Sequence, residues 1–110
     1  MDNRDTLTGY IFETIPSACS YWIEEGEQDD TILTITKQYD GDTDPLVITL
    51  AELPAHIDKW CTDYAKGHQY DYFDRFARDW LWGDYDMADY DHEVVDSIVQ
   101  FTLFGRMIYG

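Results

Sequence analysis

The chain has 110 residues, which suffices for one domain with a single hydrophobic core. It carries 23 acidic and only 7 basic residues, and the formal net charge of −16 excludes nucleic acid and anionic membranes as direct partners and favours basic proteins or cations. Aromatic residues make up 16% of the chain, which excludes a disordered acidic tail.

The cysteines and the start of the chain predict a reducing compartment. Cys19 and Cys61 have neither the number nor the spacing of a disulfide scaffold or a metal-ligand pair. The opening segment MDNRDTLTGY is polar and does not resemble a signal peptide, and the longest apolar runs are too short to span a bilayer. We therefore expect the protein in the cytoplasm of a host cell.

A helix is predicted over residues 6–15, because apolar side chains recur there at positions that share one helix face. Thr6 is a candidate cap, and Pro16 should end the helix because proline cannot continue the backbone hydrogen-bond pattern. Residues 1–5 are expected to form a loose polar end. The residues of the apolar face are Leu7, Tyr10, Ile11 and Ile15.

Three short strands are predicted next, over residues 17–25, 31–37 and 46–49. Polar turns over residues 26–30 and 39–45 separate them, and connections this short favour an antiparallel meander. In the second strand, Leu33 and Ile35 should face the core, while Ile32, Thr34 and Thr36 should share the opposite face.

A second helix follows the strands. Thr49 and Glu52 have the spacing of a capping box, but Pro54 sits too deep for a regular helix that starts at Leu50. Either the first turn is separate, or the regular helix starts at Pro54. It should end at Lys66–Gly67. The helical stripe behind this start consists of Leu53, Ile57, Trp60, Cys61 and Tyr64.

A third helix is predicted over residues 71–82, closed by Gly83. Asp74 and Arg78 should form an ion pair on its outer side, because residues four apart are neighbours on a helix surface. The side chains expected inside are Tyr72, Phe73, Phe76, Trp80 and Leu81.

The last helix should start at Asp89 or Asp91, and Asp91 as its N-cap with Glu93 in the first turn would suit the helix dipole. The helix has more apolar residues than a single buried face needs, so we expect it to be central and to pack against other elements on several sides. Gly105 either caps it or begins a short extended segment. We therefore predict a single α+β domain over residues 1–110: an N-terminal helix, a three-stranded antiparallel sheet, then three helices packed on the sheet.

The sequence does not predict a metal, a cofactor or catalytic residues. Asp40, Asp42 and Asp44 have the spacing of the first calcium ligands of an EF-hand, but Pro45 replaces the required glycine and Ala51 the bidentate glutamate. A solvated turn is the favoured interpretation. The three histidines do not form a nucleophile motif with a serine or cysteine, so we predict that the protein is not an enzyme.

The strongest candidate for a binding surface is the acidic and aromatic region over residues 70–96. In an extended or turning segment, alternate carboxylates lie about 6–7 Å apart, which is near the phosphate spacing along a nucleic-acid strand. Such a row can occupy a groove of arginines and lysines, with tyrosines stacking on guanidinium groups. The alternative is a solvated loop whose aspartates cap and turn while its aromatic residues pack inward. The candidate binding residues are Asp71, Asp74, Asp84, Tyr85, Asp86, Asp89, Tyr90 and Asp91.

The end of the chain, VVDSIVQFTLFGRMIYG, together with the earlier CSYWIEE, resembles a group of small acidic proteins encoded by phages and other mobile elements. The resemblance covers mainly residues 91–110 and weakly residues 19–25, and it implies a counter-defence role such as anti-CRISPR or anti-restriction activity. It brings no settled activity and therefore carries over no functional residues, and its Tyr-Trp and Gly…Tyr-Gly positions look structural. Those positions are Tyr21, Trp22, Asp96, Ile98, Val99, Gln100, Leu103, Phe104, Gly105, Tyr109 and Gly110.

These observations predict a non-enzymatic inhibitor of a nucleic-acid-processing defence complex, for instance a CRISPR effector. It would act as a phosphate mimic on the basic DNA or RNA surface of that partner. The alternative is a structural or regulatory protein of a phage or mobile element, for instance a homodimer, whose acidity serves only solubility.

Overall fold

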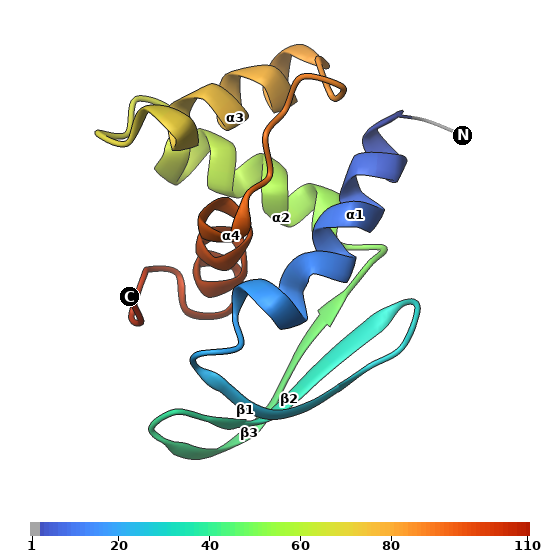
Figure 1. The fold of residues 1–110 in the computed structure, drawn as a ribbon, viewed down its shortest axis with the longest axis vertical. Helices are drawn as coiled ribbons and strands as arrows, with labels where there is room; N and C mark the ends of the chain where they lie inside the picture. The colour runs from blue at the N-terminus through green and yellow to red at the C-terminus, as the bar shows by residue number, and fades with distance from the viewer. Residues whose placement is uncertain (1–2) are drawn as a thin grey trace.

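The computed structural model describes residues 3–110, apart from the side chains of residues 42 and 43, and it confirms the predicted α+β fold class (Figure 1). One helix precedes a three-stranded sheet, and three helices follow it. The elements are α1 (Asn3–Ala18), β1 (Ile23–Gln28), β2 (Ile32–Gln38), β3 (Gly41–Thr49), α2 (Leu53–Trp60) with its π-helical continuation η1 (Cys61–Ala65), α3 (Asp71–Trp82) and α4 (His92–Phe104).

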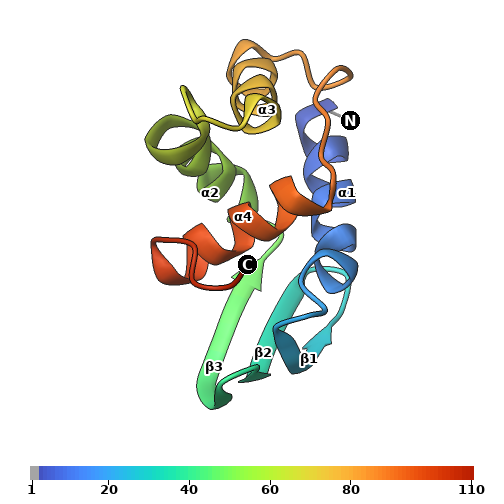
Figure 2. The same cartoon turned by 60° about the vertical axis from the view of Figure 1, so that its left-hand side comes forward.

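The helices lie on one side of the sheet, with α1 and α4 nearest to it and α3 farthest away (Figures 1 and 2). The strands are antiparallel in the order β1-β2-β3. As predicted, Leu33 and Ile35 face the core, where Ile48 joins them. On the uncovered face, Ile32 and Val47 are 41% and 51% exposed.

Helix α1 does not end at Pro16, and this corrects the predicted boundary. The helix runs to Ala18 with Pro16 inside it. Proline cannot donate to the carbonyl of Phe12 four residues earlier. Instead, the side-chain amide of Gln28, on β1, donates to that carbonyl at 2.9 Å. A contact from the sheet therefore replaces the missing backbone bond and allows the helix to continue.

The start of α1 is also better ordered than predicted. Arg4 was expected in a loose polar end, but the helix begins at Asn3 and Arg4 reaches α2. Its guanidinium donates to Asp58 at 2.7 Å and lies 5.3 Å from the ring centroid of Trp80. These two contacts attach the start of α1 to α2 and to α3.

The first two strands are shifted along the chain relative to the prediction. Strand β1 begins at Ile23 rather than at Ser17, and it passes through Gly26 into the predicted turn. The turn is shorter than predicted because the carboxylate of Asp29 accepts from the backbone N–H groups of Thr31 and Ile32, each at 2.8 Å. This side-chain turn reverses the chain within three residues.

Strand β3 starts at Gly41 rather than at Leu46, so the predicted turn over residues 39–45 contracts to its first two residues. Gly41 has φ 124°, a conformation that favours glycine. Pro45 is tolerated inside the strand because β3 is an edge strand, and the pairing register with β2 shifts across this stretch.

The helices after the sheet follow the prediction closely. Helix α2 begins at Leu53, which excludes a start at Leu50, and the Glu52 N–H donates to the Thr49 hydroxyl at 3.3 Å. Lys66 then donates to the carbonyl of Cys61, five residues earlier, which makes η1 a π-helical turn. Helix α3 has the predicted bounds, although Leu81 is 43% exposed rather than inside.

Helix α4 is central, as predicted. Of the two predicted starts, the structure has the later one, because Asp91 accepts from the N–H of Val94 at 3.0 Å and caps the helix. Residues 94–100 are all buried, and Gly105 ends the helix with φ 72°. Within residues 3–110, no helix is long and apolar enough to cross a membrane.

Three of the four tryptophans are buried, and each satisfies its indole N–H inside the protein. Trp22 donates to Asp96 at 2.8 Å, Trp60 to Ser97 at 2.9 Å and Trp80 to Asp58 at 2.7 Å. Two of these acceptors belong to α4. The core is therefore built from large aromatic side chains whose orientations are fixed by hydrogen bonds to the helices.

Replacing Gln28 by Ala tests how Pro16 is accommodated. The change leaves the partly buried carbonyl of Phe12 without a donor, so the free energy of unfolding should fall by about 1–2 kcal/mol. In a Pro16→Ala background, the restored backbone N–H supplies that donor, and the same Gln28→Ala change should cost less. Urea unfolding of the wild type, both single variants and the double variant measures this coupling; equal costs in the two backgrounds would contradict it.

Candidate functional site

Two surface features are candidates for function, and a buried carboxylate lies next to one of them. We call residues 84–91, between α3 and α4, the acidic loop. We call the cavity between α4, the first turn of α3 and the tail at residues 107–110 the aromatic groove. Its volume is about 760 Å³, within the usual range for ligand pockets.

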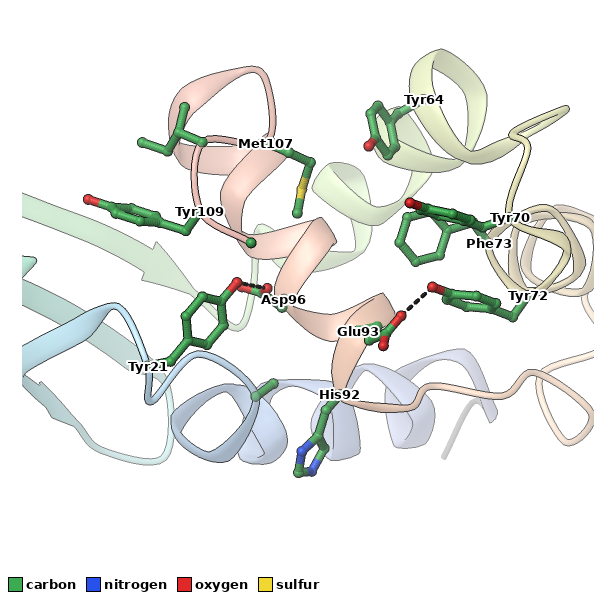
Figure 3. A pocket seen from close by; sticks show the side chains of 13 residues that line it. Tyr21, Tyr64, Tyr70, Tyr72, Phe73, His92, Glu93, Asp96, Met107 and Tyr109 are labelled. Atoms are coloured by element: carbon green, nitrogen blue, oxygen red, sulfur yellow. Dashed lines mark hydrogen bonds between the residues drawn. The ribbon is translucent and has the colours of Figure 1, made fainter. Parts of the chain in front are cut away.

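The buried carboxylate belongs to Asp96, which is 7% exposed and accepts only from neutral groups. Its Oδ1 accepts from Trp22 Nε1 at 2.8 Å, from Gln100 Nε2 at 3.0 Å and from the Cys19 thiol at 3.5 Å. Its Oδ2 accepts from the hydroxyl of Tyr21 (Figure 3). Four donors thus replace the water that this carboxylate loses on folding.

Gln100 extends this network to the tail. Its Oε1 accepts from the N–H groups of Ile108 and Tyr109 at 2.9 and 2.8 Å, and its Nε2 donates to the carbonyl of Tyr109 at 3.1 Å. The Tyr109 ring stacks on Trp22, with the ring centroids 5.1 Å apart and the planes 8° apart. Gln100 and Trp22 together fix the segment that forms one side of the aromatic groove.

The network also shifts the titration of its donors. Burial, and then the charge and hydrogen bond of Asp96, raise the pKa of the Cys19 thiol well above its ordinary value of 9.0. Desolvation and the bond to Asp96 likewise raise the pKa of Tyr21 above 10.0. Both donors therefore keep their protons at neutral and mildly alkaline pH.

The other side of the aromatic groove is a cluster of rings. Tyr70 and Tyr72 stack with centroids 5.7 Å apart and planes 9° apart, and Phe73 packs edge-on against both. Tyr64, from η1, contacts Phe73. The hydroxyl of Tyr72 donates to Glu93, and this bond raises the pKa of Tyr72 to about 12 (Figure 3).

The acidic loop begins with a tight turn, in which Met87 donates its N–H to the carbonyl of Asp84 at 3.0 Å. Three of the candidate carboxylates, Asp84, Asp86 and Asp89, are exposed. Met87 is 75% exposed, and Trp82, at the end of α3, is 84% exposed. Two large apolar side chains, one in the loop and one at the end of α3, are therefore exposed in the same stretch of the chain as three aspartates.

The other candidate residues have contacts within the protein. Tyr85 and Tyr90 are half-buried: Tyr85 packs edge-on against Trp80, and Tyr90 stacks on Tyr10. Asp91 caps α4. This half of the region follows the alternative interpretation, in which aspartates cap and aromatic residues pack inward.

Of the two candidate residues on α3, Asp74 has contacts within the protein, whereas Asp71 is exposed. Asp74 accepts from the Gly67 N–H and from Arg78, each at 2.7 Å, and these bonds lower its pKa. The ion pair with Arg78 was predicted. Asp71, in the first turn of α3, is exposed. Asp71 therefore joins the three loop aspartates as a carboxylate open to a partner.

Asp96 is the last acid of the region over residues 70–96, and the structure places it in the core rather than on the surface. A single Asp inside the apolar run VVDSIV was the signal that it lies in the core. Among the described residues, no cluster of three or more His, Cys, Asp or Glu side chains is arranged to hold a metal ion. Cys19 and Cys61 are buried free thiols.

Comparisons of the chain with protein-family models, with curated proteins and with solved structures found no match. The resemblance to mobile-element proteins therefore stays a prediction.

Asp96→Asn tests the buried network. The amide nitrogen replaces the oxygen that accepts from the Tyr21 hydroxyl, so this hydroxyl must rotate to accept, and the other donors lose a charged acceptor. The free energy of unfolding should therefore fall by about 1–2 kcal/mol. Urea unfolding measures this loss. Asp86→Asn removes the same charge from an exposed position and should change stability by less than about 0.5 kcal/mol. Similar losses for the two variants would mean that the Asp96 network contributes little.

The raised pKa values predict a loss of stability at alkaline pH. The folded protein holds the Cys19 and Tyr21 protons to higher pH than the unfolded chain, so their contribution is complete below about pH 9 and is lost as the pH rises further. Urea midpoints should therefore stay level from about pH 7 to 9 and fall above it. Tyr21→Phe should reduce this fall, whereas Tyr39→Phe, at a site 68% exposed, should leave it unchanged.

Proposed function

We propose that this protein is a non-enzymatic inhibitor that binds the basic nucleic-acid-binding surface of another protein. The observation that carries the proposal is the acidic loop, where exposed aspartates flank the exposed Met87 and follow the exposed Trp82 in the sequence. Exposed tryptophans are unusual on protein surfaces and are enriched at the centres of interfaces. Carboxylates around such an anchor select a partner of positive charge.

Each part of the acidic loop has a distinct role in this proposal. Asp84, Asp86 and Asp89 replace the phosphates that the partner's arginines and lysines otherwise bind. Trp82 supplies the stacking surface, because Tyr85 and Tyr90 already pack against rings within the protein. The net charge of −16 accelerates the encounter with a basic surface.

The target that we propose is a nucleic-acid-processing defence complex such as a CRISPR effector. Two observations support this choice: the acidity suits a surface built for DNA or RNA, and the end of the chain resembles mobile-element proteins. The inhibitor needs no chemistry of its own, because occupying the surface is enough to exclude the nucleic acid.

Reversing Asp84, Asp86 and Asp89 to Lys should abolish binding and leave the thermal midpoint within a few degrees of the wild type, because all three side chains are exposed. Capture from a lysate with CRISPR and restriction machinery, followed by mass spectrometry, measures binding to nucleic-acid-binding complexes. Wild-type capture should weaken strongly from about 0.1 to 1 M salt, since the screening length falls from about 10 to 3 Å.

A matched control reverses Glu24, Glu25 and Glu27, which are exposed on β1, to Lys. This variant carries the same net charge as the loop variant and should retain binding. Equal losses for both variants would assign binding to net charge alone, and retained binding by the loop variant would contradict the proposal. If light scattering instead shows a dimer that Trp82→Ala dissociates, the loop is a self-association surface and the structural alternative is favoured.

A further inference from the structure

The aromatic groove combines stacked rings with carboxylates. Its ring side carries Tyr70, Tyr72 and Phe73, and its base carries Glu93 and Asp96, which are three residues apart on α4 (Figure 3). Among the residues that line the groove there is no Lys or Arg. The groove therefore has a negative potential beside the electron-rich faces of aromatic rings.

Glu93 is the carboxylate that remains open to a ligand. One of its oxygens accepts from Tyr72, and among the described residues no group donates to the other. Glu93 is exposed, whereas Asp96 is buried and accepts from four donors. A cation in the groove would thus bind to Glu93 and would meet Tyr70, which is 47% exposed, beside it.

The geometry points to an arginine side chain of the basic partner as the occupant of the aromatic groove. Its guanidinium would stack on the Tyr70 and Tyr72 side and donate to Glu93. A guanidinium is planar and weakly hydrated, so it satisfies a ring face and a carboxylate together, whereas the ammonium of lysine is compact and strongly hydrated. An uncharged apolar ligand would leave the Glu93 carboxylate without a partner.

This inference rests on the proposed function, because it adds a second contact for the same basic partner. Asp71 lies between Tyr70 and Tyr72 in sequence and is exposed, and Asp91 precedes the first residue of α4. The groove is therefore close to Asp71 and to the end of the acidic loop, and its volume of about 760 Å³ accommodates an arginine with its neighbouring backbone.

The test uses the whole protein and an acetylated, amidated Gly-Arg-Gly-Arg-Gly peptide, with matched peptides that carry lysine or citrulline. Nuclear magnetic resonance titration should shift the signals of Tyr70, Tyr72 and Glu93 more than those of residues 84–89. The arginine peptide should bind more tightly than the lysine peptide, and citrulline, which keeps the shape but has no charge, should not bind measurably.

Two variants and one control locate the site. Glu93→Gln keeps an acceptor for Tyr72 but removes the charge, and it should weaken binding of the arginine peptide about tenfold. Glu24→Gln, on β1, removes one exposed charge away from the groove and should leave the affinity unchanged. Tyr70→Ala, at a half-exposed position, should weaken binding about three- to tenfold through loss of stacking.

Three results would overturn the inference: binding of the citrulline peptide as tight as that of the arginine peptide, shifts confined to residues 84–89, or equal affinities for Glu93→Gln and Glu24→Gln. Any of these, with partner capture still lost in the acidic-loop variant, would leave the proposed function intact. Peptide binding in the groove without capture of any nucleic-acid-binding protein would instead support the groove and contradict the proposed function.

Discussion

The buried carboxylate of Asp96 is the interaction on which the rest of the structure depends. A carboxylate inside a protein is costly unless donors replace the lost water, and here the donors come from the turn between α1 and β1 and from α4 itself. Through Gln100, the same network fixes the tail. Asp96 therefore joins the N-terminal half of the chain to its last helix and sets the position of one side of the aromatic groove.

Element boundaries could be predicted from the sequence where the chain carries its own local signal. Asp91 caps α4 with its own side chain, and Gly83 and Gly105 end their helices in left-handed conformations, so α3 and α4 were predicted closely. The end of α1 could not be predicted, because Pro16 is accommodated by Gln28, a contact between segments that only the fold brings together. The extension of β3 through Pro45 likewise depends on its edge position.

The candidate site, too, could be predicted only where the sequence carries a local signal. Composition alone identified the acidic loop, since three of its aspartates need only solvent around them. Composition did not reveal that Tyr85 and Tyr90 are engaged by other rings, or that Asp96 lies in the core. The aromatic groove was missed because its sides come from residues 64–73, 92–96 and 107–110, which lie far apart in the sequence.

The bulged edge strand β3 also bears on how the molecule avoids associating through its sheet. A free strand edge offers unpaired backbone groups to a strand of another chain. On β3, Pro45 has no N–H to donate, and the register shift makes the edge irregular. On the opposite edge, β1, the exposed side chains of Glu24, Glu25 and Glu27 carry like charges. Pairing of this sheet with a strand of another molecule is thereby disfavoured at both of its edges.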